Sequence, residues 1–147
     1  MPPLQDRLAT EMNAARKAQD KAHTLLLGTI LADVRNREIE LKRALTDDDV
    51  IEVLRKGVKK RKESVAAYEQ AGRTELAAQE AAEVTMLEKY LPAMASEDEV
   101  RNAVRAVIAA GAKGVGPVMG AVMPQLKGRA DGGMINRVVR EELGKSE

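Results

Sequence analysis

The sequence predicts an all-α fold, with a long N-terminal helical hairpin region followed by a small C-terminal three-helix bundle. Apolar residues recur every three or four positions along most of the chain, and no segment alternates with the period of a strand. Short segments containing Gly, Pro or Asp separate these runs and mark helix ends. Because the chain has two Tyr and no Phe or Trp, we expect its core to consist of aliphatic side chains.

The first three helices are predicted from apolar faces and capping residues. One face of a first helix is formed by Leu4, Leu8, Met12 and Ala15. Asp20 is suited to cap a second helix, whose apolar pattern extends as far as Leu45. Thr46, followed three residues later by Asp49, predicts a capping box at the start of a third helix.

A fourth helix is expected to lead to a boundary within the chain. Gly72 is suited to end the third helix, and the next apolar pattern begins near Thr74. That pattern stops at Leu91-Pro92, because the residue before a proline is pushed out of the helical conformation. We therefore expect an N-terminal helical region at 1–92 and a C-terminal helical domain at 93–147.

The C-terminal domain is expected to contain three helices. Ser96 and Glu99 predict a second capping box. Pro117 is suited to be the first residue of the next helix, where its missing N–H costs nothing. Pro124 should kink or shorten that helix, and Asp131 is expected to cap the last one.

Residues suited to catalysis or metal binding are scarce. The chain has no Cys, and its single histidine, His23, has no ligand cluster around it in the sequence. None of Ser64, Ser96 and Ser146 lies in a nucleophile motif. The glycines between 111 and 120 match neither phosphate-binding fingerprint, so we interpret them as a helix stop and start. We expect no catalytic residue, no metal site and no cofactor.

Charge and hydropathy set expectations about partners and location. The net charge is +1, so no overall field draws the chain toward nucleic acid or membrane, and we expect no DNA partner. No run of 18 apolar residues is present, and the N-terminal segment does not resemble a secretory signal. We expect no membrane partner and a cytoplasmic location.

Two local clusters of cations are candidates for binding phosphate groups. The first lies on the third helix and contains Arg55, Lys56, Lys59, Lys60, Arg61 and Lys62. The second lies near the last helix and contains Lys113, Lys127, Arg129, Arg137 and Arg140. The second cluster faces one acid, Asp131, and lies around a helix N-terminus that adds positive potential. Alternatively, the first cluster is only a solvated helix face, and in the second Arg129 pairs with Asp131 while the other cations only aid solubility.

The motifs around the second cluster resemble a known family. The segment 119–123, the K-G-R-A-D-G run at 127–132, and Asn136 and Val139 resemble the C-terminal signature of the GatB/YqeY family. Segments of the N-terminal half are similar to free-standing YqeY proteins, namely 38–41, 45–47, 61–64, 71–73 and 88–92. The similarity covers nearly the whole chain.

The resemblance implies a helical fold and a relation to tRNA. The family includes the tail of GatB, a subunit of the glutamine-dependent amidotransferase that amidates misacylated tRNA. In that complex the tail is a helical tRNA-contacting module, and the catalytic centres lie in other domains. The family label is therefore a carbon–nitrogen ligase with glutamine as amide donor, an activity that we do not expect of this chain alone.

Two hypotheses of different classes follow. The first is a non-catalytic module that binds tRNA or a tRNA–protein complex, with Lys127, Arg129, Arg137 and Arg140 on phosphates and close backbone approach at Gly128 and Gly132. The second is a protein-interaction adaptor. It would dock on an amidotransferase or an aminoacyl-tRNA synthetase through an exposed apolar seam at Met119, Val122 and Met123. The alternative, which the apolar character of these residues favours, is that they are ordinary core. A cationic surface would favour the first hypothesis, and an apolar patch would favour the second.

Overall fold

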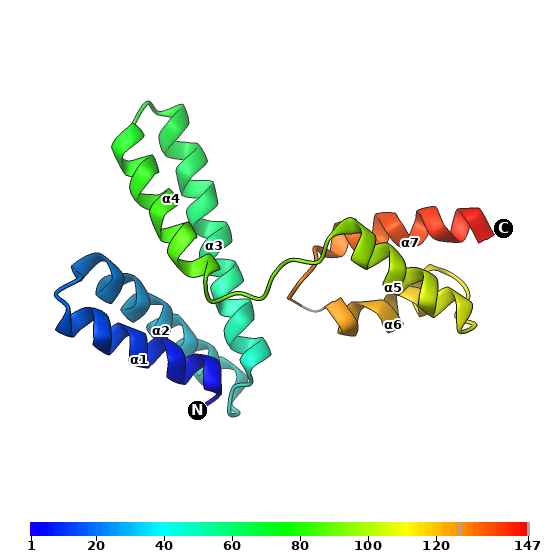
Figure 1. Cartoon of the computed structure of the whole chain (residues 1–147), viewed down its shortest axis with the longest axis horizontal. Coiled ribbons are helices and arrows are strands. Elements are labelled where there is room, and N and C mark those ends of the chain that lie inside the picture. The colour runs from blue at the N-terminus through cyan, green and yellow to red at the C-terminus, as the bar shows by residue number, and fades with distance from the viewer. Residues whose placement is uncertain (127, 147) are drawn as a thin grey trace. The chain divides into compact units, whose positions relative to one another are not determined.

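The computed structural model describes residues 1–126 and 128–146, and these residues form helices and no strands. This confirms the predicted all-α class. The helices, drawn in Figure 1, are α1 (Pro3–Lys17), α2 (Lys21–Leu41), α3 (Asp47–Gln70), α4 (Thr74–Glu88), α5 (Glu97–Ala109), α6 (Val115–Val122), the 3-10 turn η1 (Met123–Leu126) and α7 (Gly132–Ser146). The chain divides into two compact units, Met1–Leu91 and Pro92–Glu147, which we call unit 1 and unit 2.

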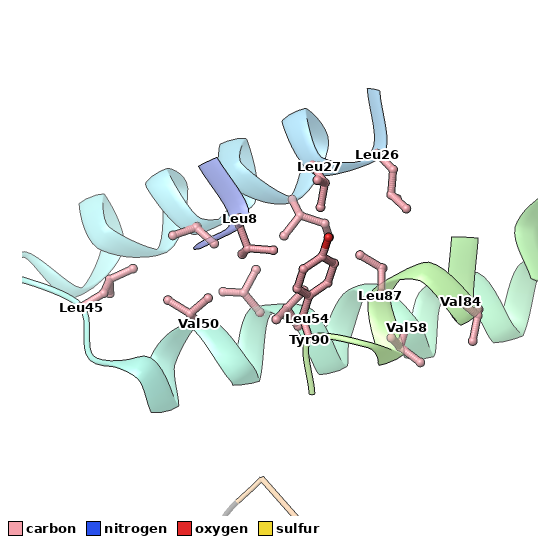
Figure 2. Packing of buried hydrophobic residues seen from close by; sticks show 13 residues of the cluster. Leu8, Leu26, Leu27, Leu45, Val50, Leu54, Val58, Val84, Leu87 and Tyr90 are labelled. Carbon is pink, nitrogen blue, oxygen red and sulfur yellow. The ribbon is translucent and has the colours of Figure 1, made fainter. Parts of the chain in front are cut away.

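Unit 1 consists of two helical hairpins, α1 with α2 and α3 with α4 (Figure 1). Its core is aliphatic apart from one aromatic ring, as the sequence predicts. Figure 2 shows Leu8, Leu27, Leu54 and Leu87 pointing into the space between α2 and α3, with Tyr90 beside them. Each of these four leucines is fully buried. Burying a leucine side chain stabilises a fold by about 1.5–3 kcal/mol, so these contacts dominate the stability of unit 1.

Gly57 in the middle of α3 lets α2 and α3 pack closely. A Cβ atom at this position would lie 3.0 Å from Cδ1 of Ile30, which is itself fully buried. It would also lie 3.3 Å from Nη1 of Arg61. Glycine is otherwise unfavourable inside a helix, by roughly 0.8–1.0 kcal/mol relative to alanine. The close approach of the helices therefore explains its presence.

The predicted caps of unit 1 are present, but α2 is shorter than predicted. The Asp20 carboxylate accepts the His23 N–H at 3.1 Å, and Thr46 and Asp49 form the reciprocal capping box. The prediction that α2 extends to Leu45 is wrong, because the helix ends at Leu41 and Lys42 takes a left-handed conformation with φ of 55°. That conformation ends the run of helical hydrogen bonds.

Unit 2 packs α5, α6 and α7 around a core made largely of valine, including the fully buried Val104 and Val118. Ser96 caps α5 by accepting the Glu99 N–H at 3.1 Å. The prediction of a second capping box is wrong for the Glu99 side chain. Its carboxylate accepts a hydrogen bond from Arg129 at 2.9 Å instead of one from the Ser96 backbone N–H. Glu99 therefore joins α5 to the turn that precedes α7.

Of the two predictions made for Pro117 and Pro124, one is wrong and one is confirmed. The helix begins at Val115, so Pro117 is its third residue and the predicted start at Pro117 is wrong. A proline is still tolerated there, because the first turn of a helix has no intrahelical acceptor for its N–H groups. Pro124 shortens the helix as predicted, and the chain continues as the 3-10 turn η1.

Candidate nucleic-acid interface

The strongest free cationic surface of the described chain lies on the solvent side of α3. We call it the α3 lysine face, and it consists of Lys56, Lys59, Lys60 and Lys62, all of which are exposed. Lys56 lies 3.6 Å from the Glu52 carboxylate. The other three lysines take part in none of the ion pairs formed among residues 1–126 and 128–146. Three ammonium groups on one stretch of helix are thus available to an external anion.

The two arginines predicted with these lysines belong to the interior of unit 1. The Arg61 side chain is 14% exposed, and its Nε donates to Glu83 at 2.9 Å. Its Nη1 donates to the Gly57 carbonyl at 3.0 Å, so the guanidinium joins α3 to α4. Arg55 is half-buried, and this burial lowers the pKa of its guanidinium. The structure therefore separates the sequence cluster into exposed lysines and two packed arginines.

A groove of about 580 Å³, lined mainly by polar and charged residues, runs between α2, α3 and α4 beside the lysine face. Lys56 and Lys60 lie on its α3 side, while Asp33 comes from α2 and Glu80 from α4. Both cations and anions line this groove, and Arg37 on its wall is already paired with Glu40 at 2.8 Å. A polyanion is therefore expected to contact the outer lysines instead of entering the groove.

The arginines of the second predicted cluster are engaged with acids or with an amide of their own unit. Arg137 pairs with Glu97 at 2.6 Å and with Glu141 at 3.0 Å. Arg140 donates to the side-chain oxygen of Asn136 at 2.9 Å. The contacts with Glu97 and Glu141 raise the pKa of Arg137.

Arg129 is also paired, and its partner is not the acid next to it in the sequence. Its Nη2 donates to Glu99 at 2.9 Å, and its Nε donates to the Ala93 carbonyl at 3.0 Å. The alternative that Arg129 pairs with Asp131 is therefore wrong. Asp131 instead accepts the Gly133 N–H at 3.2 Å, which is the predicted cap of α7.

The remaining residues of this cluster have different surroundings. Lys113 is exposed, and the described residues form no ion pair with it. Lys127 lies outside the described residues. Gly128 has a φ of 75°, which favours glycine, and Gly132 is the first residue of α7. The structure thus gives Gly128 a conformational role in the turn.

Unit 2 contains an ion-pair network that the sequence did not reveal. Glu142 of α7 is 5% exposed and accepts from Arg101 at 2.7 Å and from Arg105 at 3.0 Å, both on α5. Hydrogen bonds from Arg105 and then Arg101 lower the pKa of Glu142 to about 2. Glu142 and its two arginines lie about 40 positions apart in the sequence, so only the packing of α5 on α7 brings them together.

The apolar seam expected for an adaptor is mostly core. Val122 is fully buried, and Met119 packs against the core of unit 2, so the expectation of an exposed seam at these two residues is wrong. Met123 is 41% exposed. Helix periodicity alone could not separate this apolar side from an external docking surface, because both show the same pattern.

His23 has a partner that sequence reasoning missed. Its Nε2 lies 3.2 Å from the Tyr90 hydroxyl, which also donates to Glu11 at 3.3 Å. The Arg7 guanidinium lies 4.9 Å from the centroid of the Tyr90 ring. This polar group joins α1 and α2 to Tyr90, which lies two residues beyond the end of α4. It holds no group of three possible metal ligands, and neither does any other part of the described chain.

Comparison with known proteins defines the family. The family model described as "Yqey-like protein" matches residues 5–143 of the chain. The chain belongs to the YqeY family. The matched residues extend over both unit 1 and unit 2. The α3 lysine face and the K-G-R-A-D-G turn therefore both lie within the family match.

Curated relatives of this YqeY-like chain come from fungi. An uncharacterized protein of Schizosaccharomyces pombe is 30% identical over 96 residues, which cover 65% of this chain and 78% of that protein. A relative from Pyrenophora tritici-repentis is named "Altered inheritance of mitochondria protein 41, mitochondrial". It is 26% identical over 145 residues, or 94% of this chain and 80% of the relative. A protein of the same name from Kluyveromyces lactis is 31% identical over 96 residues, covering 63% of this chain and 52% of that protein.

Those names place two relatives in mitochondria and specify no ligand or reaction. The cytoplasmic location expected for this chain stays a prediction. No helix among the residues that the structure describes combines the length and the apolar character needed to cross a membrane.

Proposed function

We propose that this YqeY-like chain is a non-catalytic module that binds folded RNA through phosphate groups, with the α3 lysine face as its main contact surface. The observation that supports the proposal most directly is that Lys59, Lys60 and Lys62 are exposed and take no part in the ion pairs of the described chain. Exposed cations that are free of acids can replace the counterions condensed on a nucleic acid, and this replacement drives phosphate binding.

The geometry favours recognition of the RNA backbone over recognition of bases. From Lys56 to Lys62 the α3 helix rises about 9 Å, so that neighbouring phosphates of one strand lie within reach of the long lysine side chains. Tyr90 is buried, and Tyr68 is half-buried on α3, so the exposed lysines are not interleaved with aromatic rings on which bases could stack. Phosphate contacts carry no sequence information, and binding would depend on the shape and charge of the RNA.

We propose tRNA as the RNA because the sequence resembles the tRNA-contacting tail of GatB. The C-terminal cluster would then act as a second contact surface. Lys113 and Arg140 are its most accessible members among the described residues, whereas Arg129 and Arg137 would first have to leave acidic partners. The contacts of the described residues therefore support the α3 lysines more than the C-terminal cations, which the sequence alone favours.

A salt titration of tRNA binding tests the proposal. The change of Lys59, Lys60 and Lys62 to alanine should weaken binding at least about tenfold and reduce the log–log salt slope by roughly 2–3, or about 0.7–0.9 for each lost phosphate contact. The comparison variant is Lys113→Ala with Arg140→Ala, which removes two exposed cations from the second contact surface in unit 2 and should weaken binding less than the triple change. Circular dichroism verifies that both variants are folded.

Two results would overturn the assignment. Equal affinity and slope for the folded triple variant would remove the α3 lysine face. A larger loss in the Lys113 and Arg140 variant would move the main contact to unit 2. Titrating several unrelated RNAs side by side shows whether the loss of affinity depends on the RNA sequence. We expect that it does not, because phosphate contacts carry no sequence information.

A further inference from the structure

The turn between α1 and α2 carries cations that pair with no acid of the described chain. Residues 12–32 contain three cations, Arg16, Lys17 and Lys21, and one acid, Asp20, so their local charge is +2. All three cations are exposed, and none belongs to the ion pairs formed among residues 1–126 and 128–146. The Asp20 carboxylate caps α2 by accepting the His23 N–H at 3.1 Å. The expectation of no membrane partner rests on the net charge of the whole chain and does not describe this surface.

The backbone of this turn brings cations from both helices to one hollow. Gln19 has a left-handed conformation with φ of 60°, and its N–H donates to the Arg16 carbonyl at 3.1 Å, which closes the end of α1. Beside the turn lies an open hollow of about 720 Å³, lined by Arg16, Gln19, Lys21, Thr24 and Leu25. Two cationic side chains and one amide that can donate hydrogen bonds therefore surround the same space.

The hollow is also lined by an exposed leucine. The Leu25 residue is 74% exposed, and Ala22, one helical turn earlier on the same side of α2, is exposed as well. At the other end of α2, Ile39 is 68% exposed but lies between Glu38 and Glu40 in the sequence, whereas no acid lies within four positions of Leu25. An exposed leucine among cations suits a partner that offers anionic groups and hydrocarbon together.

We propose that the α1–α2 turn docks on the surface of a membrane that contains anionic lipids. Arg16, Lys17 and Lys21 contact the headgroup phosphates, and the Leu25 side chain enters the boundary of the acyl chains. Basic side chains are attracted to an anionic leaflet, and an apolar side chain adds affinity by leaving water. RNA offers phosphates but no hydrocarbon for Leu25, and the exposed large apolar side chains of the described residues include none from α3. The two surfaces therefore suit different polyanions.

Co-sedimentation of the full-length chain with lipid vesicles tests this docking. We expect binding to vesicles of phosphatidylcholine and phosphatidylglycerol in equal amounts, no binding to phosphatidylcholine alone, and weaker binding as salt rises. Arg16→Gln with Lys21→Gln should weaken binding by roughly tenfold or more, since each basic side chain near an anionic surface contributes about a factor of five. Leu25→Ser should weaken binding at least about threefold without changing the charge, because it removes the apolar contact.

The matched controls lie at the other end of α2. Arg35→Gln with Lys42→Gln removes two exposed cations that also take part in none of the ion pairs of the described residues. Ile39→Ser removes an exposed apolar side chain that is flanked by acids. Both controls should bind the mixed vesicles as the wild-type chain does, and circular dichroism verifies that every variant is folded.

Three outcomes would overturn the docking of this turn. Wild-type affinity of the folded Arg16 and Lys21 variant for the mixed vesicles would remove the turn from the contact. An equal loss in the Arg35 and Lys42 variant would show attraction of any cation to the vesicles instead of a built surface. A loss of tRNA binding in the Arg16 and Lys21 variant, with vesicle binding unchanged, would assign the turn to RNA.

Discussion

The cations of unit 1 and unit 2 are used differently. On α3, the sequence places basic residues beside the acids Glu52 and Glu63, and the structure leaves Lys59, Lys60 and Lys62 exposed and outside the ion pairs of the described chain. In unit 2, residues 113–140 contain one acid, Asp131, yet Arg129 and Arg137 both contact acids of α5.

This difference shows that charge counted along the sequence is a poor guide to charge on a surface. A helix receives the charges of every helix packed against it, and the first turn of α5 brings Glu97 and Glu99 next to Arg137 and Arg129. On α3, Lys59, Lys60 and Lys62 are exposed and take part in none of the ion pairs of the described residues, so these cations stay available. Counterions or phosphates can compete only for charges that the fold leaves available.

The largest expected effect is on the core of unit 1. Leu54→Ala removes a fully buried side chain from the cluster between α2 and α3 and should lower the free energy of unfolding by about 2–5 kcal/mol. Tyr68 and Tyr90 are the only aromatic residues of the chain, and both belong to unit 1. Tyrosine fluorescence therefore follows unit 1 during urea unfolding, while circular dichroism follows both units.

The two signals together test whether the units can be compared as separate bodies. If they unfold separately, Leu54→Ala should shift the fluorescence transition and leave part of the circular dichroism transition unchanged. Ile135→Ala, which removes a side chain that is 1% exposed from unit 2, should do the reverse. A single transition shifted equally by both changes would show that the units unfold together.

The next effect distinguishes the units by their response to acid. The arginine contacts lower the pKa of Glu142 from an ordinary 4.5 to about 2. A carboxylate with a lowered folded-state pKa stabilises the fold above its unfolded pKa and loses that contribution as the pH falls through the folded value. The contribution of Glu142 should therefore be complete above about pH 4.5 and decline toward pH 2.

The measurement is the circular dichroism melting temperature of the wild-type chain and of Glu142→Gln between pH 7 and pH 2. The variant should melt lower at neutral pH, because Arg101 and Arg105 lose a charged acceptor. The gap between the two proteins should narrow as the pH falls below about 4.5. Parallel curves down to pH 2 would contradict the role given to this carboxylate.

A smaller effect is expected at the cap of α7. The Asp131 carboxylate accepts the Gly133 N–H, and Asp131→Ala should cost about 0.5–2 kcal/mol. Asp131→Asn is the matched control, because asparagine caps about as well without the charge. An unchanged melting curve for Asp131→Ala would exclude capping. Loss of RNA binding at unchanged stability would assign the carboxylate to the interface.

Much of the fold could be predicted because helix signals are local. The Thr46–Asp49 capping box, the αL glycine at Gly72 and the break at Pro124 each depend on a few neighbouring residues. The end of α2 was missed because the apolar pattern continues through Leu45, which is buried although it lies outside the helix. Periodicity reports which residues are buried and not which conformation buries them.

The candidate site was harder to predict, because it depends on which helices pack together. The sequence indicates six cations on α3, but only the structure shows that Arg61 is used to bind Glu83 of α4. The pairing of Arg129 with Glu99 likewise spans 30 positions. No motif or spacing in the sequence encodes that contact.

The smallest expected effect concerns the Tyr90 hydroxyl of unit 1 and its contacts with Glu11 and His23. The stability that this group contributes should change at high pH and not at low pH. Tyr90→Phe removes the hydroxyl that donates to Glu11 and contacts His23, and should cost about 0.5–1.5 kcal/mol. Burial, and then the negative charge of Glu11, raise the pKa of Tyr90 to about 12 from its ordinary value of 10.0. The folded state thus holds the phenolic proton more tightly than the unfolded state.

The direction of the pH dependence follows from this raised pKa. The contribution of the Tyr90 hydroxyl should be complete below about pH 10 and should be lost as the pH rises through about 12. An absorbance titration in a Tyr68→Phe background isolates the Tyr90 phenol, and urea unfolding at pH 8 and pH 11 measures the stability. Titration of Tyr90 near pH 10 in the folded protein would show that the ring is open to water. Such a result would contradict the burial of the Tyr90 phenol in the core of unit 1.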